Sequence, residues 1–83
     1  MIEVDFYEII KDKQQKVAVM SFDGEKLSWK ICKDKNIEDI INDEIIVDEK
    51  EIYPDKQPEE FIKNLYKGYS GTYLRASKPR IGK

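Results

Sequence analysis

The first third of the chain alternates apolar and polar side chains, and this period of two constrains the fold more than any other feature. In the segment 2–7, every second residue is strongly apolar, as in a strand with one buried face. The segments 16–22 and 26–31 have the same strand character. Asp23-Gly24, which lies between them, is typical of a two-residue hairpin turn. The sequence therefore predicts three consecutive antiparallel strands, with the polar residues 11–15 connecting the first two.

A two-residue turn at Asp23-Gly24 also predicts a register for the second and third strands. It pairs Phe22 with Glu25, Met20 with Leu27 and Ala18 with Trp29. Directly opposed side chains share one face of a sheet, so these apolar residues would form one continuous face. This agreement between the turn and the pattern assigns Trp29, the single tryptophan, to the core.

The middle of the chain predicts a short helix followed by a second hairpin. Asn36 can cap the helix, because an amide side chain accepts a hydrogen bond from the first helical N–H groups. The apolar residues on one side of this helix are Ile37, Ile40 and Ile41. Residues 45–47 and 51–53 read as two short strands about a turn at 48–50.

The last third of the chain predicts a helix and a final strand. Pro58 suits the first turn of a helix, where its missing N–H has no partner. The apolar stripe of this helix consists of Phe61, Ile62 and Leu65. Gly68 fits just past the helix end, in a left-handed conformation. Residues 72–76 read as a short last strand, and residues 77–83 as a basic, flexible tail.

These elements together predict an α+β fold for residues 1–76. Its antiparallel sheet would consist of the N-terminal three-stranded meander, with a second hairpin beside it, and the short helix and the C-terminal helix would pack on the sheet. A chain of 83 residues makes one domain with a small core, and an unpaired sheet edge invites a second chain. We therefore expect a homodimer or a complex with another protein.

Composition excludes several kinds of chemistry. The chain has no histidine and one cysteine, Cys32, so it lacks the commonest general base and the usual ligands of a zinc site. We therefore expect no enzyme activity, no cofactor and no metal. The N-terminus is acidic, and no stretch approaches eighteen apolar residues, which predicts a cytoplasmic protein that does not enter a membrane.

Charge is divided along the chain. Residues 1–60 hold all seventeen acids and nine lysines, a net charge of −8, whereas residues 61–83 hold six basic residues and no acid. The last 23 residues also contain three of the five tyrosines. Such a basic and aromatic segment is a candidate binding surface, and its predicted site residues are Tyr66, Lys67, Tyr69, Tyr73, Arg75, Lys78 and Arg80.

Three functions are consistent with this division, and each assigns no catalytic residue. The first is a small binding or accessory domain that contacts a protein partner through the basic segment. The second is binding of single-stranded nucleic acid by the same segment, since cations contact phosphates and tyrosines stack on bases. The third is an acidic mimic of nucleic acid. The sequence leaves open whether the basic segment instead pairs with the acidic front of its own chain.

Overall fold

The computed structural model describes residues 1–71 and 73–82, and it confirms the predicted α+β fold. The elements in chain order are β1 (Ile2–Ile10), β2 (Lys13–Phe22), β3 (Leu27–Cys32), α1 (Lys35–Ile41), β4 (Ile45–Val47), β5 (Lys50–Ile52), α2 (Pro58–Gly68), β6 (Leu74–Ala76) and β7 (Arg80–Ile81). Thr72, the first residue of the predicted last strand, lies outside the described residues, as does Lys83.

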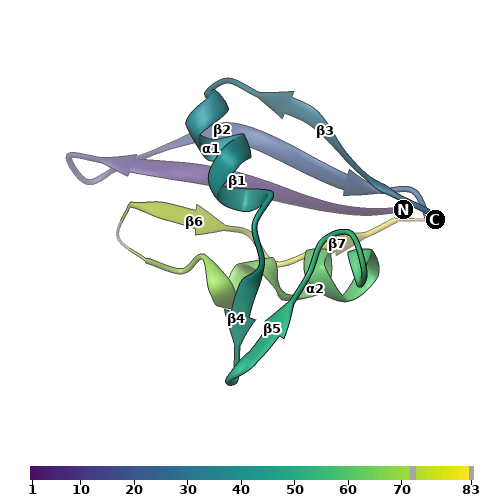
Figure 1. Cartoon of the computed structure of the whole chain (residues 1–83). Helices are drawn as coiled ribbons and strands as arrows, with labels where there is room; N and C mark the ends of the chain where they lie inside the picture. The colour runs from purple at the N-terminus through teal and green to yellow at the C-terminus, as the bar shows by residue number, and fades with distance from the viewer. Residues whose placement is uncertain (72, 83) are drawn as a thin grey trace.

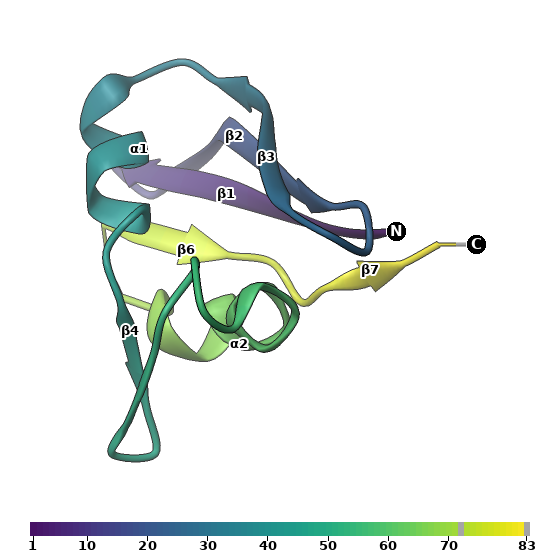
Figure 2. The same cartoon turned by 45° about the vertical axis from the view of Figure 1, so that its right-hand side comes forward.

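The main sheet is antiparallel and has the order β3-β2-β1-β6, with β7 paired to β1 beside β6. Strands β4 and β5 form a separate two-stranded sheet that projects from the body of the molecule (Figure 1). Both helices lie on one side of the main sheet, and Figure 2 shows α2 beneath the strands. β1 and β2 are therefore the inner strands, and β1 pairs with three others, β2, β6 and β7.

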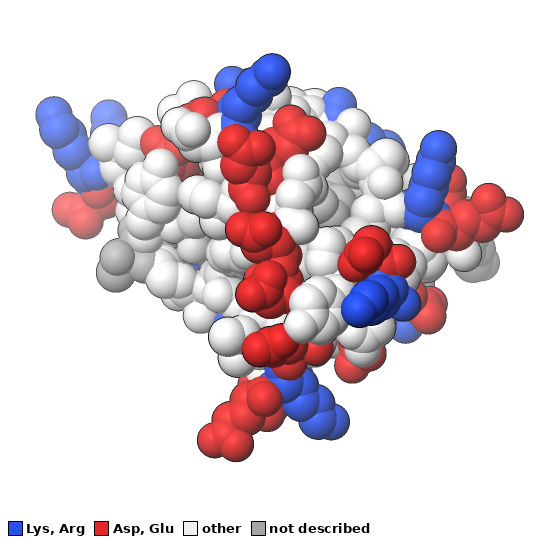
Figure 3. Space-filling view, in the orientation of Figure 1, with Lys and Arg blue, Asp and Glu red and all other residues white. Residues whose placement is uncertain are grey.

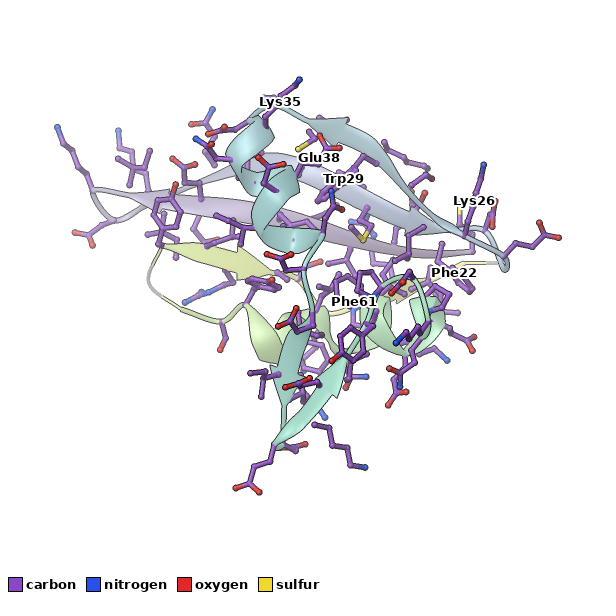
Figure 4. The ribbon with its side chains drawn as sticks, in the orientation of Figure 1. Phe22, Lys26, Trp29, Lys35, Glu38 and Phe61 are labelled. Atoms are coloured by element: carbon purple, nitrogen blue, oxygen red, sulfur yellow. The ribbon has the colours of Figure 1, made fainter. Side chains whose placement is uncertain are left out.

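The core lies between the sheet and the two helices. Phe22, Trp29 and Phe61 come from β2, β3 and α2 and lie in this layer (Figure 4). The largest fully buried side chains are Val4, Phe6, Ile37, Ile41, Phe61, Ile62 and Leu65. The alternating residues of β1 and the apolar stripe of α2 thus bury the faces that the sequence predicts.

The predicted register of β2 and β3 is wrong, although the predicted face is right. Four residues, 23–26, form the loop, so that Phe22 lies opposite Leu27 and Met20 opposite Trp29. The Asp23 carboxylate accepts hydrogen bonds from the backbone N–H groups of residues 25 and 26, at 2.8 and 2.9 Å, and this holds the wider loop. A shift of two residues returns each side chain to the same face, so the apolar face survives.

The other two hairpins turn through two residues in the left-handed region. Lys11 and Asp12 have φ angles of 50° and 64°, and Asp48 and Glu49 have φ angles of 52° and 66°. Such turns match the right-handed twist of the paired strands. The polar connection predicted at 11–15 is consequently shorter, because residues 13–15 already belong to β2.

The ends of the helices differ from the prediction in two places. Asp34, and not Asn36, caps α1, since its carboxylate accepts a hydrogen bond of 2.9 Å from the Asn36 N–H. Gly68 is the last residue of α2 and is not a left-handed cap. A Cβ at this position would lie 3.3 Å from Cβ of Ile45, so glycine allows α2 to approach β4 closely. Ile40, predicted to share the buried side of α1, is 44% exposed.

The two ends of the chain lie side by side. The N–H of Gly82 donates to the carbonyl of Met1 at 2.8 Å, and the Met1 amino group donates to the carbonyl of Gly82 at 3.2 Å. Figure 1 shows the termini together at one end of the sheet. Within the predicted tail, 77–83, residues Arg80 and Ile81 form the strand β7 against β1.

The left-handed turn of β4 and β5 yields a stability prediction. We expect the double substitution Asp48→Asn with Glu49→Gly to stabilise the protein by about 1 kcal/mol, because these residue types adopt positive φ with less strain. Urea unfolding followed by circular dichroism measures the change. As a control, Glu25→Gly lies in a loop position without a positive φ and should give no gain. Equal or lower stability of the double variant would contradict the strain argument.

Candidate functional site

The structure separates the seven predicted site residues into two groups, and the first group takes part in the fold. Tyr69 packs its ring edge-on to Phe6, with centroids 6.4 Å apart, and its hydroxyl donates to the carbonyl of Ile40 at 3.1 Å. Burial, and then the negative charges of Asp43 and Glu44, raise the pKa of the Tyr69 hydroxyl. Tyr66 also packs against the core. Both tyrosines therefore stabilise the fold.

Arg80 belongs to the same group, because it binds the acidic front of the chain. Its guanidinium donates to both carboxylate oxygens of Asp5 and lies 4.0 Å from the carboxylate of Glu3. Lys16 lies 3.7 Å from Asp5, and Lys30 forms an ion pair with Glu3. The bond from Lys30 lowers the pKa of the Glu3 carboxyl. Five charged side chains thus form one network on the face of the sheet opposite the core.

The second group stays exposed and contains Lys67, Tyr73, Arg75 and Lys78. Lys67 lies on the last turn of α2, with its ammonium 5.9 Å from the centroid of the Tyr66 ring. Arg75 lies in β6 opposite Tyr7. Within residues 1–71 and 73–82, the three cations form no ion pair with an acid. The structure therefore leaves a smaller basic segment than the sequence predicts.

Carboxylates gather on another face, in a line over α1 and the β4–β5 hairpin that is here called the acidic stripe (Figure 3). The acidic residues of this part of the chain, 38–51, are Glu38, Asp39, Asp43, Glu44, Asp48, Glu49 and Glu51. In the described part of the chain, none of them forms an ion pair with a lysine or arginine. A hydrogen bond to Glu51, followed by the charges of Glu51 and Glu44, raises the pKa of the Tyr53 hydroxyl, which reflects this negative potential.

A hollow of about 380 Å³ opens beside the acidic stripe, between β3, the end of α1 and the segment that leads into α2. In Figure 4, Trp29 lies on its α1 side and Lys26 lies toward the β2–β3 loop. The residues that line it are Met20, Glu25, Lys26, Leu27, Ser28, Trp29, Asn42, Pro54, Asp55 and Pro58. The Trp29 ring contacts Phe6 at 5.7 Å between centroids and remains partly exposed, so the hollow has an aromatic wall.

The sequence analysis did not predict this hollow, because it favoured the core over ligand contact for Trp29. Two signals were present in the sequence. Trp29 lies on the last strand of the predicted meander, where a sheet edge leaves one side uncovered. Pro54 and Pro58 also bracket a loop whose rigid backbone can form a wall. What the pattern did not show is that this loop folds back beneath β3.

No protein-family model, no curated protein and no solved structure matches this chain. Among residues 1–71 and 73–82, no group of three or more acidic or cysteine side chains is placed to hold a metal ion. Nor does any helix in that part of the chain have the length and apolar character needed to cross a bilayer. The candidate site therefore depends on its own geometry and charge.

The pairing of Arg80 with Asp5 predicts a role in stability. We expect Arg80→Gln to destabilise the protein by about 2 kcal/mol, because it leaves a carboxylate with 5% side-chain exposure facing only the ammonium of Lys16. The exposed Arg75→Gln on the neighbouring strand is the matched control and should change stability by less than about 0.5 kcal/mol. Urea unfolding measures both, and equal effects would show that the Arg80 pair does not stabilise the fold.

Proposed function

We propose that this protein is a non-catalytic binding domain, and that the hollow beneath β3 holds a positively charged segment of a protein partner. The observation that carries this proposal is a hollow of about 380 Å³ with a tryptophan wall, placed beside carboxylates that have no ionic partner in the described chain. Contact with a protein is also the role that the division of charge predicts. The proposed surface differs from the basic segment, because much of that segment takes part in the fold.

The shape of the hollow supports an apolar anchor. Its volume lies near the lower end of the range of small-molecule pockets, which begins at about 300 Å³, so it has room for an apolar side chain. Met20, Leu27 and Trp29 supply apolar surface from the sheet, and Pro54 and Pro58 supply it from the opposite wall. Tryptophan is among the residues most enriched at binding hot spots. A leucine or phenylalanine side chain of a partner would fit these walls.

The charge around the hollow supports a basic partner. Glu25 and Asp55 line it, and Lys26 is the one cation among the lining residues. The acidic stripe begins beside it, since Asp43 follows the lining residue Asn42. An interface with complementary charge speeds association and excludes partners of the wrong sign. Lysine or arginine next to the apolar anchor therefore gives the best match.

The proposal predicts which peptides the hollow selects. From a phage-displayed library of random heptapeptides, we expect enrichment of sequences with an apolar residue next to lysine or arginine. The strongest heptapeptide, made synthetically, should shift the emission of Trp29, the only tryptophan, because its ring lines the hollow. Fluorescence titration gives its affinity. Enrichment of acidic peptides, or no enrichment at all, would refute the proposed function.

Matched charge variants locate the contact. Glu25→Gln with Asp55→Asn should weaken the selected heptapeptide at least fivefold, because two lining carboxylates are lost. Glu8→Gln with Asp12→Asn removes the same charge at the far end of β1 and should keep the affinity within twofold (Figure 1). If both double variants weaken binding equally, only the overall charge matters and the hollow is not the binding site.

A second candidate function is contact with single-stranded RNA by the exposed part of the basic segment. The observation that favours it is the 55% exposure of Tyr73, whose ring lies on the chain between cations that have no acidic partner in the described residues. Bases stack on exposed aromatic rings, while lysine and arginine contact the phosphates. Tyr66, Tyr69 and Arg80 would contribute less, because the fold engages them.

This second function predicts that RNA binding depends on salt and is lost when the exposed basic side chains are neutralised. A fluorescein-labelled twelve-nucleotide oligouridine should bind at 50 mM salt and weaken as salt rises, because cations on RNA are released. The triple variant Lys67→Gln, Arg75→Gln and Lys78→Gln should reduce its affinity at least tenfold in fluorescence anisotropy. A control with Lys11, Lys13 and Lys35 changed to Gln should bind as the parent does. An anisotropy that stays flat for the parent protein would end the RNA hypothesis.

A further inference from the structure

β3 is the edge strand of the main sheet on the side away from β1. β2 pairs with one of its edges, and no described strand pairs with the other. An open edge presents backbone N–H and C=O groups that can bond to another extended chain. Its position matters here, because Leu27, Ser28 and Trp29 of this strand also line the hollow.

The pattern of hydrogen bonds in the hairpin shows which backbone groups face the open edge. The N–H of Asp23 donates to the carbonyl of Lys26 at 3.3 Å, so these two residues form a hydrogen-bonded pair. Bonded and non-bonded pairs alternate along an antiparallel ladder. The next pair, Phe22 with Leu27, is therefore non-bonded, and so is Met20 with Trp29. Leu27 and Trp29 thus direct their N–H and C=O groups away from β2, toward the open edge.

Leu27 and Trp29 direct both their side chains and their free backbone groups toward the region of the hollow. The side chains of Leu27 and Trp29 line the hollow, and their backbone groups lie at its rim. A chain added beside β3 would run about 4.8 Å away, with alternate side chains directed to the hollow side of the sheet. One of these side chains could fill the hollow, and its neighbours two residues away could reach the carboxylates of Glu25 and Asp55.

We propose that the partner segment binds by forming a short β-strand along the open edge of β3, with its apolar anchor in the hollow. This inference rests on the proposed function and adds the conformation of the ligand to it. Backbone bonds give such a complex affinity, and the alternate side chains give it specificity. The added strand is short, because β3 is irregular at Lys30, where the pairing with β2 shifts by one residue.

The occupant is a segment of another protein and not β3 of a second copy. Two copies of β3 paired antiparallel about Ser28 would place Lys26 directly opposite Lys30, and like charges at opposed positions are destabilising. The proposed segment avoids this, because its basic side chains lie on the hollow face beside Glu25 and Asp55. The opposite edge of the main sheet is formed by β6 and β7, and residues 69–70 already bond beside β6, since the N–H of Ala76 donates to the carbonyl of Tyr69 at 2.8 Å and Ser70 bridges to Arg75. Among the edges of the main sheet that the structure describes, β3 therefore combines open backbone groups with a place for a side chain.

Backbone N-methylation of the selected heptapeptide tests this inference. Each residue in turn is methylated at its amide nitrogen, which removes one N–H donor and leaves the side chain unchanged. In an added strand, only every second amide bonds to β3. We expect a loss of at least tenfold in affinity at alternate positions within the bound stretch, and changes within threefold at the positions between them. Equal tolerance at all positions would overturn strand addition while the selected heptapeptide still supports the proposed function.

Hydrogen exchange gives an independent readout on the protein. The amides of Leu27 and Trp29 should exchange at least tenfold more slowly in the complex, because each gains a partner. The amide of Ser28 already bonds to β2 by the same alternation and should change less than threefold. Equal protection of all three amides would show general stabilisation and overturn the inference. If the unmodified heptapeptide does not bind, the proposed function fails and the inference fails with it.

Discussion

The pairing of β1 on both of its edges is the constraint on which the rest of the structure depends. β2 bonds to one edge, and β6 and β7 bond to the other, so the two ends of the chain meet on this strand. Its alternating side chains also divide the molecule. Val4 and Phe6 enter the core, whereas Glu3 and Asp5 point to the opposite face, where Arg80 binds them. Because β1 is paired on both sides, the outer edges of the main sheet are β3 on one side and β6 with β7 on the other.

Folding neutralises part of the basic end of the chain by ion pairing, whereas the carboxylates of the acidic stripe stay without ionic partners. In the basic end, Arg80 pairs with Asp5 and Glu3, which lie 75 or more positions away in the sequence. This part of the predicted binding surface therefore stabilises the fold. The acidic stripe shows the opposite behaviour, because its carboxylates lie on α1 and the β4–β5 hairpin and form no ion pair with the described cations of the basic end. Charge that the fold does not neutralise internally is the charge available to a partner.

The local pattern of the sequence predicted most of the buried faces, with Ile40 of α1 as an exception, but not the distances between segments. The apolar face of β2 and β3 was correct even though the register shifted, because a shift of two residues preserves which side a residue faces. Gly68 illustrates the limit, since its role depends on the approach of Ile45 from another element. The hollow has the same origin: β3, α1 and the loop at Pro54 each looked ordinary in sequence, and only their packing leaves space between them.

In the free protein, the hollow exposes apolar surface and the carboxylates beside it lack ionic partners. One kind of partner would remove both unfavourable features. The hollow leaves apolar surface near Trp29 in contact with water, in a domain whose core is already small, and burying one leucine or phenylalanine there would contribute roughly 1.5–3 kcal/mol. The unpaired carboxylates beside it repel one another at low salt. A metal ion or a simple cation would neutralise the carboxylates but leave the hollow empty. A neutral apolar ligand would fill the hollow but leave the carboxylates without a counter-charge. An extended segment that carries an apolar residue between basic ones satisfies both, and its backbone can bond to the edge of β3 at the same time.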